Sequence, residues 1–503
     1  MILMMLCIER HRFLALSGRW QDPADHEEAK LGRGERGAAA ECLARCVFVH
    51  PLRHSVSRLS PPRASFSASN QQQQQPRMVT SVPQADTPGV ETATGGTMPK
   101  PASQRLHVQL GESFYDLTGW RKLHPAGEHW IDRFAERDAT DVMAAFHSDD
   151  AFDRLKTLPV VKGKEGVEPN DVTKNYRAFR KELVDAGWFD RVWYKDASVL
   201  ALQLATFAAG VVVTRVNPWL GTLVMGIAHT TGGWLAHDMV HGRGRYCTAM
   251  RHYGALMCGL SSKWWSEKHN LHHAFTNVIG ADEDIIVEPA LWLWAPDDGR
   301  DRPWRKFQHL YWPLPFSLTF LLWRIGSIKT AISENLKLEG ALLALHYCLL
   351  LALVPLPVAI GHVFFGGWLT ATIVTVTHTA EEFSVKDEPA HPSSPFEEEG
   401  EASFVETQFK TTRDAVCGDP LSEHLWGGMQ YQLEHHLFPT LPRYKYRHLV
   451  PLVKKFAEEN GLEYKSTGSW DIIRDNIMQL KRVGEAPTNP GSPEPGQLVI
   501  NKS

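Results

Sequence analysis

Cysteine is scarce in this sequence and is not arranged for cross-linking. The 503 residues include seven cysteines, and only Cys42 and Cys46 lie close together. This scatter excludes a disulfide framework and a zinc-ribbon pattern, both of which need recurring short cysteine spacings. We therefore expect the folded part of the chain to face a reducing compartment.

An excess of one charge is also missing. Lysine and arginine number 53 and aspartate and glutamate 57, a formal net charge of −4, so nothing favours nucleic acid as a partner.

The mean hydropathy of −0.26 would by itself indicate a soluble protein. Polar ends, however, dilute strongly apolar segments between residues 197 and 380. Each segment is near the length that crosses roughly 30 Å of hydrocarbon.

Histidine is abundant beside these apolar segments, in three groups. They read His-Asp-Met-Val-His at 237–241, His-Asn-Leu-His-His at 269–273 and Gln-Leu-Glu-His-His at 432–436. Spacings of i, i+4 and i, i+3, i+4 place imidazoles on one face of a helix. So many nitrogen ligands near a membrane would be costly without a metal, and imidazole suits iron, copper, zinc or nickel. Because one such ion takes three or four ligands, three groups indicate two metal ions.

The chain divides into four regions. Residues 1–102 carry a glutamine run and no apolar period, so we expect them to be disordered. They could also hold a targeting segment, because residues 43–67 are rich in arginine and serine and lack acidic residues. A start codon assigned too early, with Met78 or Met98 as the first residue, is the alternative. Three regions follow: a compact unit at 103–163, a membrane part at 164–483 and a disordered tail at 484–503.

The membrane part is predicted to contain two helical hairpins. A third stretch, 311–323, is short and holds two prolines, so we expect it to lie at the interface. Each hairpin enters and leaves on one side, so all histidine groups share one compartment. Flanking basic residues mark that side as cytosolic, or stromal in a plastid. The expected spans are 197–214 with 219–236, and 341–359 with 362–380.

The compact unit carries a His-Pro-Ala-Gly turn at 124–127 after an alternating strand at 107–110. In this it resembles the cytochrome b5 fold, and the resemblance implies that His124 and His147 are the axial ligands of a b-type haem. Two axial imidazoles leave no open position on the iron, which favours electron transfer. Ala126 stands where the family has glycine, and the turn would be strained if that position needed a positive φ. The alternative is two ordinary histidines in a small α+β module.

The order of the three histidine groups carries a second resemblance. Trp264-Trp265 precede the second group and a Gly-Gly-Met-Gln-Tyr sequence precedes the third. From residue 105 to about 465 the chain resembles the membrane fatty acid desaturases. Gln432 in place of a histidine, with the fused cytochrome b5 module, resembles the front-end subgroup. The resemblance implies a mainly α fold, a four-transmembrane-helix histidine-box desaturase with an N-terminal α+β cytochrome b5-like haem domain. It also implies two non-haem iron ions and a set of catalytic ligands: His237, His241, His269, His272, His273, His435 and His436, with His378 as an eighth ligand.

Neighbours of these ligands are candidates for supporting roles. Asp238, Glu267 and Glu434 could accept imidazole N–H bonds, and Gln432 could bind weakly, hold a water or orient a neighbour. We expect Trp264 and Trp265 to line the acyl entrance. Met239, Val240 and a long acidic loop at 381–402 depart from the family pattern and bear on substrate preference.

The implied reaction inserts a double bond into a (poly)unsaturated long-chain fatty acyl group of a lipid. In this family a di-iron centre reduces O₂ to water with two electrons from acyl C–H bonds and two from outside, and the fused haem would supply the latter. The donor is then a cytochrome b5 reductase using NADH, at the endoplasmic reticulum with the catalytic face cytosolic, or ferredoxin in a plastid. A homodimer is left open.

Other functions fit the same motifs. A sphingoid-base desaturase or an acyl hydroxylase would use the same centre. A non-catalytic haem carrier would leave the histidines with zinc or with nothing. The oxidised carbon pair and the acyl carrier, whether phospholipid, galactolipid or CoA, stay open at this level.

Overall fold

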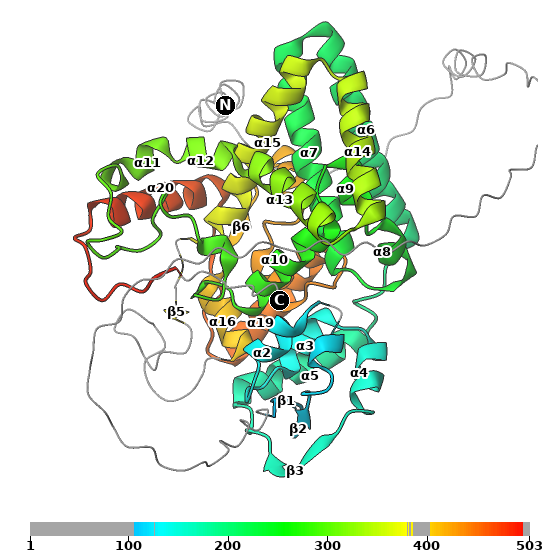
Figure 1. Ribbon diagram of the computed structural model, residues 1–503, viewed down its shortest axis with the longest axis vertical. Coiled ribbons are helices and arrows are strands. Elements are labelled where there is room, and N and C mark those ends of the chain that lie inside the picture. The colour runs from blue at the N-terminus through cyan, green and yellow to red at the C-terminus, as the bar shows by residue number, and fades with distance from the viewer. Residues whose placement is uncertain (1–104, 125, 380, 382–383, 386–402, 496–503) are drawn as a thin grey trace, which may run out of the picture. The chain divides into compact units, whose positions relative to one another are not determined.

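The computed structural model describes residues 105–124, 126–379, 381, 384–385 and 403–495. The predictions for residues 1–102, for most of the 381–402 loop and for 496–503 lie outside this part of the chain. Within it the fold is mainly α-helical with three small sheets (Figure 1).

The N-terminal unit is the small α+β structure expected from the sequence. Its antiparallel sheet has the order β1 (His107–Leu110), β2 (Ser113–Asp116), β3 (Val160–Glu165). The apolar side chains of Val108 and Phe114 alternate with polar ones and are buried. Four helical segments accompany the sheet: η1 (Arg121–Leu123), α2 (Glu128–Arg133), α3 (Thr140–Phe146) and α4 (Asp149–Leu155).

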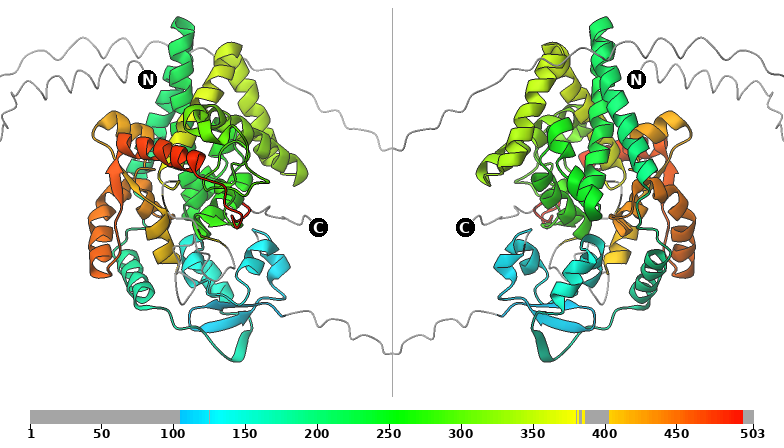
Figure 2. Two further views of the ribbon diagram at one scale, coloured as in Figure 1. Left: turned by 90° about the vertical axis from the view of Figure 1, so that its left-hand side faces the viewer. Right: turned by 90° about the vertical axis from the view of Figure 1, so that its right-hand side faces the viewer.

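Four long helices form two hairpins (Figure 2). The first joins α6 (Trp193–Val216) to α7 (Pro218–His241) through Asn217, whose side chain accepts hydrogen bonds from two backbone N–H groups at the start of α7. Pro218 occupies the first turn of α7, where no amide donor is needed. The second joins α14 (Lys337–Leu353) to α15 (Leu356–Val376), and α7 packs along both α6 and α15.

Two of the described helices, α6 and α15, are long and apolar enough to cross a membrane. The expectation of four spans is therefore not confirmed. The helix α14 has only 17 residues, and α7 carries His229, His237 and His241 beside small polar residues. Most side chains of α7 are buried, so it faces protein and does not need the uniform apolar surface that lipid contact demands.

The stretch expected at the interface is not one continuous helix. It covers the end of α11 (Gln308–Tyr311), all of α12 (Pro313–Ser317) and the start of α13 (Thr319–Ser333). Pro313 lies in the first turn of α12, because a proline ring is accommodated there and not within a helix.

Segments before the first hairpin and after the second share one apolar core. Tyr176 of α5 (Asp171–Asp185) is fully buried in this core and donates a hydrogen bond to the carbonyl oxygen of Leu437 at 2.7 Å. Leu433 and Leu437 of α18 (Gln432–Leu437) pack in the same core. The core therefore fixes the helix that carries the third histidine group.

The remaining helices are α8 (Gly244–Met250), α9 (Tyr253–Met257), α10 (Ser262–Ala274), α16 (Phe404–Thr411), α17 (Pro420–Trp426) and α19 (Tyr446–Glu459). Shorter elements are η2 (Glu283–Ile285), η3 (Arg305–Phe307), η4 (Arg443–Lys445) and the parallel pairs β4 (Val278–Ile279) with β5 (Ser384–Val385) and β6 (Asp414–Val416) with β7 (Ser466–Gly468).

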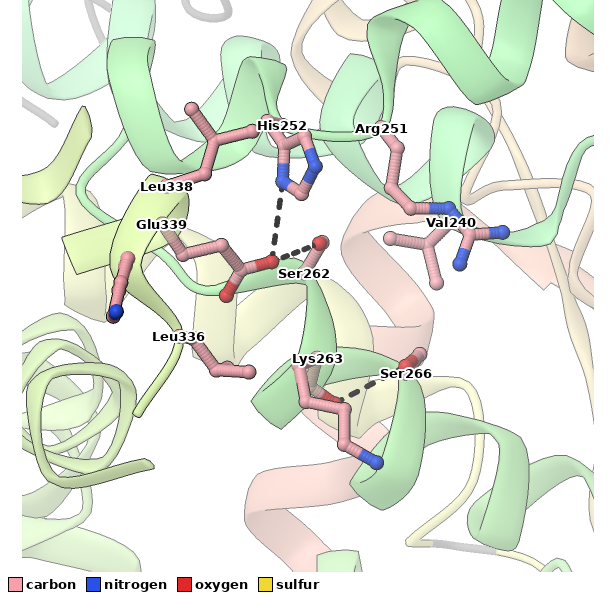
Figure 3. Close-up of a pocket in the computed structure, with 10 residues that line it drawn as sticks. Val240, Arg251, His252, Ser262, Lys263, Ser266, Leu336, Leu338 and Glu339 are labelled. Atoms are coloured by element: carbon pink, nitrogen blue, oxygen red, sulfur yellow. Dashed lines mark hydrogen bonds and ion pairs between the residues drawn. The ribbon is translucent and has the colours of Figure 1, made fainter. Parts of the chain in front are cut away.

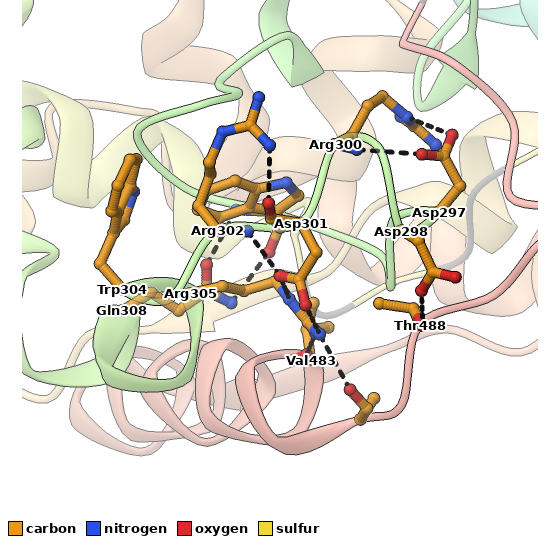
Figure 4. A network of polar contacts seen from close by, with 12 residues as sticks. Asp297, Asp298, Arg300, Asp301, Arg302, Trp304, Arg305, Gln308, Val483 and Thr488 are labelled. Carbon is orange, nitrogen blue, oxygen red and sulfur yellow. Dashed lines mark hydrogen bonds and ion pairs between the residues drawn. The ribbon is translucent and has the colours of Figure 1, made fainter.

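The C-terminal helix α20 (Ser469–Glu485) is tied to the loop before η3 (Figure 4). Arg305 pairs with Asp301 at 2.7 Å and donates a hydrogen bond to the carbonyl oxygen of Val483. Beyond the helix, the backbone N–H of Asn489 donates to the carbonyl of Pro296. Residues 486–495, which the sequence assigned to the tail, thus contact this loop.

Candidate metal centre

The first histidine pair lies in the last turn of α7. His237 and His241 are one helical turn apart, so their rings lie on the same face with centroids separated by 4.7 Å. Both side chains are buried. The close packing of α7 against its neighbours thus delivers two imidazoles to the inside of the protein.

The helix α10 supplies the second group to two different places. It begins at Ser261, whose hydroxyl accepts a hydrogen bond from the N–H of Trp264. His269 and His273, again one turn apart, face the first pair, with His241 and His273 ring centroids 4.7 Å apart. His272 lies between them in sequence and therefore points about 100° away from His273 around the helix.

The short helix α18 supplies the third group. Its position depends on the turn before it, where Gly427 has a φ of 56° and a Cβ would lie 2.3 Å from the indole of Trp234. Only glycine allows this approach. The indole N–H of Trp234 also donates to the carbonyl of Leu425 at 2.9 Å, so α7 holds the turn from which His435 and His436 project.

All eight predicted ligand positions come together in two buried groups. Within each group the candidate ligand atoms lie within 4.8 Å of one another. The helices α10 and α18 each contribute to both groups. The five-histidine group comprises His237, His241, His269, His273 and His435, and the three-histidine group comprises His272, His378 and His436.

The nitrogen atoms of these groups converge in a way that suits cations. The Nε2 atom of His269 lies 2.7 Å from Nε2 of His237 and 3.1 Å from Nε2 of His273. Two ligands bound to one ion at a right angle, with bonds of about 2.1 Å, lie about 3 Å apart. Several further buried nitrogens have no hydrogen-bond partner, and such atoms are costly unless an ion satisfies them. They are both ring nitrogens of His241 and the Nε2 atoms of His435 and His436.

Oxygen atoms hold the other side of several rings. The Nδ1 atom of His272 donates to a carboxylate oxygen of Asp282 at 2.8 Å, and Nδ1 of His378 donates to the carbonyl of Thr411 at 3.0 Å. This arrangement fixes the ring and leaves Nε2 as the ligand atom. Two more pairs have the same form, His436 with the side-chain oxygen of Gln408 at 2.8 Å and His435 with the hydroxyl of Tyr446 at 3.2 Å.

The sequence did not point to these oxygen acceptors. Asp238 pairs with Arg443 at 3.1 Å, and Glu267 pairs with Lys263 at 2.6 Å. Neither carboxylate accepts an imidazole N–H at hydrogen-bond distance. The sequence did not predict Asp282 as the partner of His272, because Asp282 lies beyond the end of the second group, after a turn that reverses the direction of the chain. An acid so soon after a histidine group was the one available signal.

Burial sets the protonation of most of these rings. It lowers the pKa of His269, His273, His435 and His436 well below the ordinary value, and that of His378 to about 3. These imidazoles are therefore neutral and able to bind a metal. Burial acts on His272 as well, but the carboxylates of Asp282 and Asp284 together outweigh it, so the pKa of His272 is raised. The Asp282 carboxylate would also stabilise a cation bound to that ring.

Gln432 lies at the edge of the three-histidine group. Its side-chain nitrogen is 2.9 Å from Nε2 of His378, and its side-chain oxygen is buried without a partner. The amide therefore faces the same space as the ligand atom of His378. Of the roles considered from the sequence, orienting a neighbour or binding weakly both suit this placement.

The N-terminal unit brings its two predicted ligands together. The ring centroids of His124 and His147 are 6.1 Å apart, and bonds of about 2 Å on opposite sides of one ion place two imidazole centroids roughly 6 Å apart. The Nδ1 atoms lie 3.2 Å from the carbonyls of Gly127 and Met143, so each Nε2 is left for the ion. Ala126 needs no positive φ, because Gly127 takes it with a φ of 103°.

Comparison with known proteins identifies the fold around these histidines. The fatty acid desaturase family model matches residues 214–468. The chain belongs to that family. Residues 102–180 match the cytochrome b5-like haem/steroid binding domain, so this is a desaturase with a fused cytochrome b5 domain. It is 28% identical over 392 residues to the Delta(8)-fatty-acid desaturase of Euglena gracilis (71% of this chain, 90% of the relative). It is 29% identical over 426 residues to the Delta(6)-fatty-acid desaturase fat-3 of Caenorhabditis elegans (72% and 93%).

The desaturase has a narrow apolar cavity beside the five-histidine group. Its walls include His237, Trp265, Phe320 and Trp323. The Trp265 ring also stacks on His269 at 4.9 Å. Of the two tryptophans singled out in the sequence, Trp265 is the one that lines this cavity.

A larger cavity of about 360 Å³ opens next to it (Figure 3). Val240, Arg251 and Ser262 line both cavities, so the two adjoin. Glu339 accepts a hydrogen bond from the Ser262 hydroxyl on one wall. Lys337 lies at the same cavity and, like Arg251, has no acidic partner among the residues that the structure describes.

Three further histidines of the desaturase lie together but outside both groups. The ring of His229 is 4.4 Å from that of His362 and 5.8 Å from that of His346. Each Nδ1 donates to a backbone carbonyl, that of His229 to Met225 at 2.9 Å. His229 is thus a packed helix histidine bonded to a backbone carbonyl, and it belongs to neither ligand group.

Proposed function

We propose that this desaturase inserts a double bond into a (poly)unsaturated long-chain fatty acyl group of a lipid, as a front-end enzyme. The observation that carries the proposal is the convergence of eight buried imidazoles in a five-histidine and a three-histidine group beside an apolar cavity. Non-haem iron bound there would supply the oxidising power, with O₂, that no side chain has for an unactivated C–H bond.

The two groups would hold one iron each. The neutral rings of His269, His273 and His435 offer lone pairs without loss of a proton. Asp282 and Gln408 hold their partner rings from behind, so these do not turn when the ion is absent. The chain's own residues thus supply the ligands, their orientation and a water-poor surrounding.

The adjoining cavities support a path for the acyl chain. A short methylene segment of the acyl chain would lie along Trp265 and Phe320 in the apolar cavity, next to His237. The head group would stay in the larger cavity, where Arg251 and Lys337 favour an anionic carrier. A phosphate-bearing carrier, phospholipid or CoA, therefore suits this entrance better than a neutral galactolipid.

The cytochrome b5 domain would bring electrons from outside. His124 and His147 would hold its haem from both faces, which leaves no position for O₂. An NADH-dependent cytochrome b5 reductase is the donor that fits a cytosolic site, and ferredoxin would replace it in a plastid. We propose the domain limits 103–163 for the haem unit and 164–483 for the desaturase.

We propose that all four hairpin helices are embedded in the membrane of the endoplasmic reticulum. The helices α6 and α15 meet the requirements for spanning alone. Helix α7 packs along both of them, and α14 is joined directly to α15 through Val354 and Pro355. Both hairpins then return to one side. Basic residues flank that side, including Arg243, Arg245 and Arg251, which supports a cytosolic face.

Expression in yeast supplied with several C18 and C20 polyenes tests the proposal. We expect new double bonds on the carboxyl side of existing ones when fatty acids are mapped. Long-chain bases from the same cells should be unchanged, because the relatives named above are fatty acid desaturases. Products found only among long-chain bases, or hydroxylated acyl chains, would replace the proposal by its alternative.

Metal analysis of the purified protein separates the enzyme from a haem carrier. We expect about two non-haem irons per chain in addition to the haem, since two ligand groups are present. Zinc or no metal at the histidines would favour the carrier.

A further inference from the structure

The cytochrome b5 domain contacts the five-histidine group through one aromatic side chain. Phe146, the last residue of α3, directly precedes the proposed haem ligand His147. Its ring stacks on His241 with centroids 6.3 Å apart and an interplanar angle of 23°. It also meets His273 edge-on at 6.1 Å. The side chain is 9% exposed, so it is enclosed between the two sites.

Further contacts hold the domain in this position. Phe134 stacks on Phe275 at 5.3 Å, and Trp130 packs with Leu271 in the same apolar cluster. Trp130 lies on α2 and Phe134 directly follows it, whereas Leu271 lies on α10 and Phe275 directly follows that helix. The helix that carries the second histidine group therefore also forms the docking surface for the cytochrome b5 domain. Aromatic pairs of this kind contribute about 0.5–1.5 kcal/mol each beyond the area they bury.

An ion pair fixes the other side of α3. Arg177 of α5 bonds to both carboxylate oxygens of Asp141 at 2.9 Å and to Asp138 at 3.0 Å. Arg180 donates to the carbonyl of Ala144 at 2.6 Å. Since α5 packs in the core that holds α18, the haem unit is anchored on both sides of Phe146.

We propose that Phe146 is a positioning residue for electron transfer within the chain. It couples the haem held by His124 and His147 to the five-histidine group while the domain stays docked. This inference rests on the proposed function. Each transfer would move one electron from the haem held by His124 and His147, which would change from ferrous to ferric, to an iron held by the five-histidine group, which would change from ferric to ferrous. An NADH-dependent flavoprotein would then reduce the haem again, and two such transfers would accompany each double bond.

The test uses the full-length holoenzyme and three variants at this position. Phe146→Leu keeps an apolar side chain but removes the ring, whereas Phe146→Tyr and Phe146→Trp keep a ring. Phe134→Leu is the matched control, because it removes a stacked ring from the same interface without adjoining a haem ligand. Three quantities are compared: the haem spectrum with non-haem iron content, the rate of haem reoxidation after mixing with O₂ and acyl substrate, and hydrogen exchange of α10.

We expect Phe146→Leu to keep its haem and iron and its exchange protection while haem reoxidation slows by about tenfold or more. Phe146→Tyr and Phe146→Trp should recover most of the rate, and Phe134→Leu should stay within about twofold of wild type. An unchanged rate in Phe146→Leu would overturn the inference. So would a slower rate that follows a loss of protection in α10, because Phe146 would then serve docking alone. Wild-type protein with full haem and iron but no substrate-dependent reoxidation would instead overturn the proposed function.

Discussion

Asp282 accepts a hydrogen bond from Nδ1 of His272 at 2.8 Å, and both side chains are buried. The same carboxylate is itself held in place, since it accepts hydrogen bonds from the backbone N–H groups of Asn277 at 2.9 Å and Asp284 at 2.8 Å. A rigid anion behind a ligand ring sets which nitrogen faces the metal and makes that nitrogen a stronger donor.

Replacing Asp282 should therefore weaken metal binding at the three-histidine group. We expect Asp282→Asn to lower the affinity of that group for iron by about 10- to 100-fold, measured by competition with a chelator. Asp284→Asn is the control, because Asp284 lies 3.9 Å from His272 and pairs with Lys268. Equal affinity in the Asp282 variant and its control would contradict the role given to this carboxylate.

The division into two groups predicts separate losses of metal. We expect His241→Ala and His436→Ala each to reduce the non-haem iron content from about two to about one per chain, because each removes a ligand from a different group. Both should abolish desaturation and leave the haem spectrum intact. His424→Ala, a half-buried histidine outside both groups, should keep both irons. An unchanged iron content in either ligand variant would refute the grouping.

The sequence predicted the members of the site better than their surroundings. Within one helix, the i, i+4 spacing of His237 and His241 already placed both rings on one face. The assignment of His272 and His273 to different groups depends on how α10 packs, and no spacing rule contains that. Asp282 lies ten residues after His272, beyond a turn, and Gln408 and Tyr446 reach the rings of His436 and His435 from other helices. Tertiary packing rather than a spacing rule therefore determines these three partners.

The difference between local sequence and tertiary packing also explains why only two of the described helices meet the requirements for spanning alone. Hydropathy predicted four spans, and two helices meet the requirements for spanning alone. The helix α7 departs because most of it is buried in protein, and His229 with several threonine and glycine residues lowers its mean hydropathy. Mean hydropathy alone does not distinguish such protein-facing residues from lipid-facing ones.

Gly427, in the turn before the third histidine group, should not tolerate a larger side chain. We expect Gly427→Ala to destabilise the protein by roughly 1–3 kcal/mol, because φ is 56° and the new Cβ would lie 2.3 Å from the Trp234 indole. Thermal unfolding in detergent measures this. Gly418→Ala, where a Cβ would meet nothing within 4 Å, should change stability little. A Gly427 variant as stable as this control would show that the turn adapts.

The larger cavity predicts that charge affects substrate affinity. We expect Lys337→Ala to raise KM for a phosphate-bearing acyl substrate about two- to fivefold with kcat unchanged, the effect of losing one exposed charge pair. Lys329→Ala, an exposed lysine on α13 that does not line the cavity, should have no effect. A KM that rises equally for a neutral galactolipid would argue against a role in binding phosphate.

A variant of the haem unit should lose the supply of electrons while the desaturase part still binds its metal ions. His124→Ala should lose the haem spectrum but retain about two non-haem irons, because the ligand groups lie in the other part of the chain. His129→Ala is the control: it removes a nearby histidine of the same unit whose ring adjoins Trp130 rather than His147. We expect desaturation in cells to fall sharply for His124→Ala and to recover in part when free cytochrome b5 is supplied, since the desaturase part is unchanged. A His124 variant with a normal haem spectrum would remove this residue from the axial position, and a variant that lost both haem and iron would show that the two sites do not fold independently.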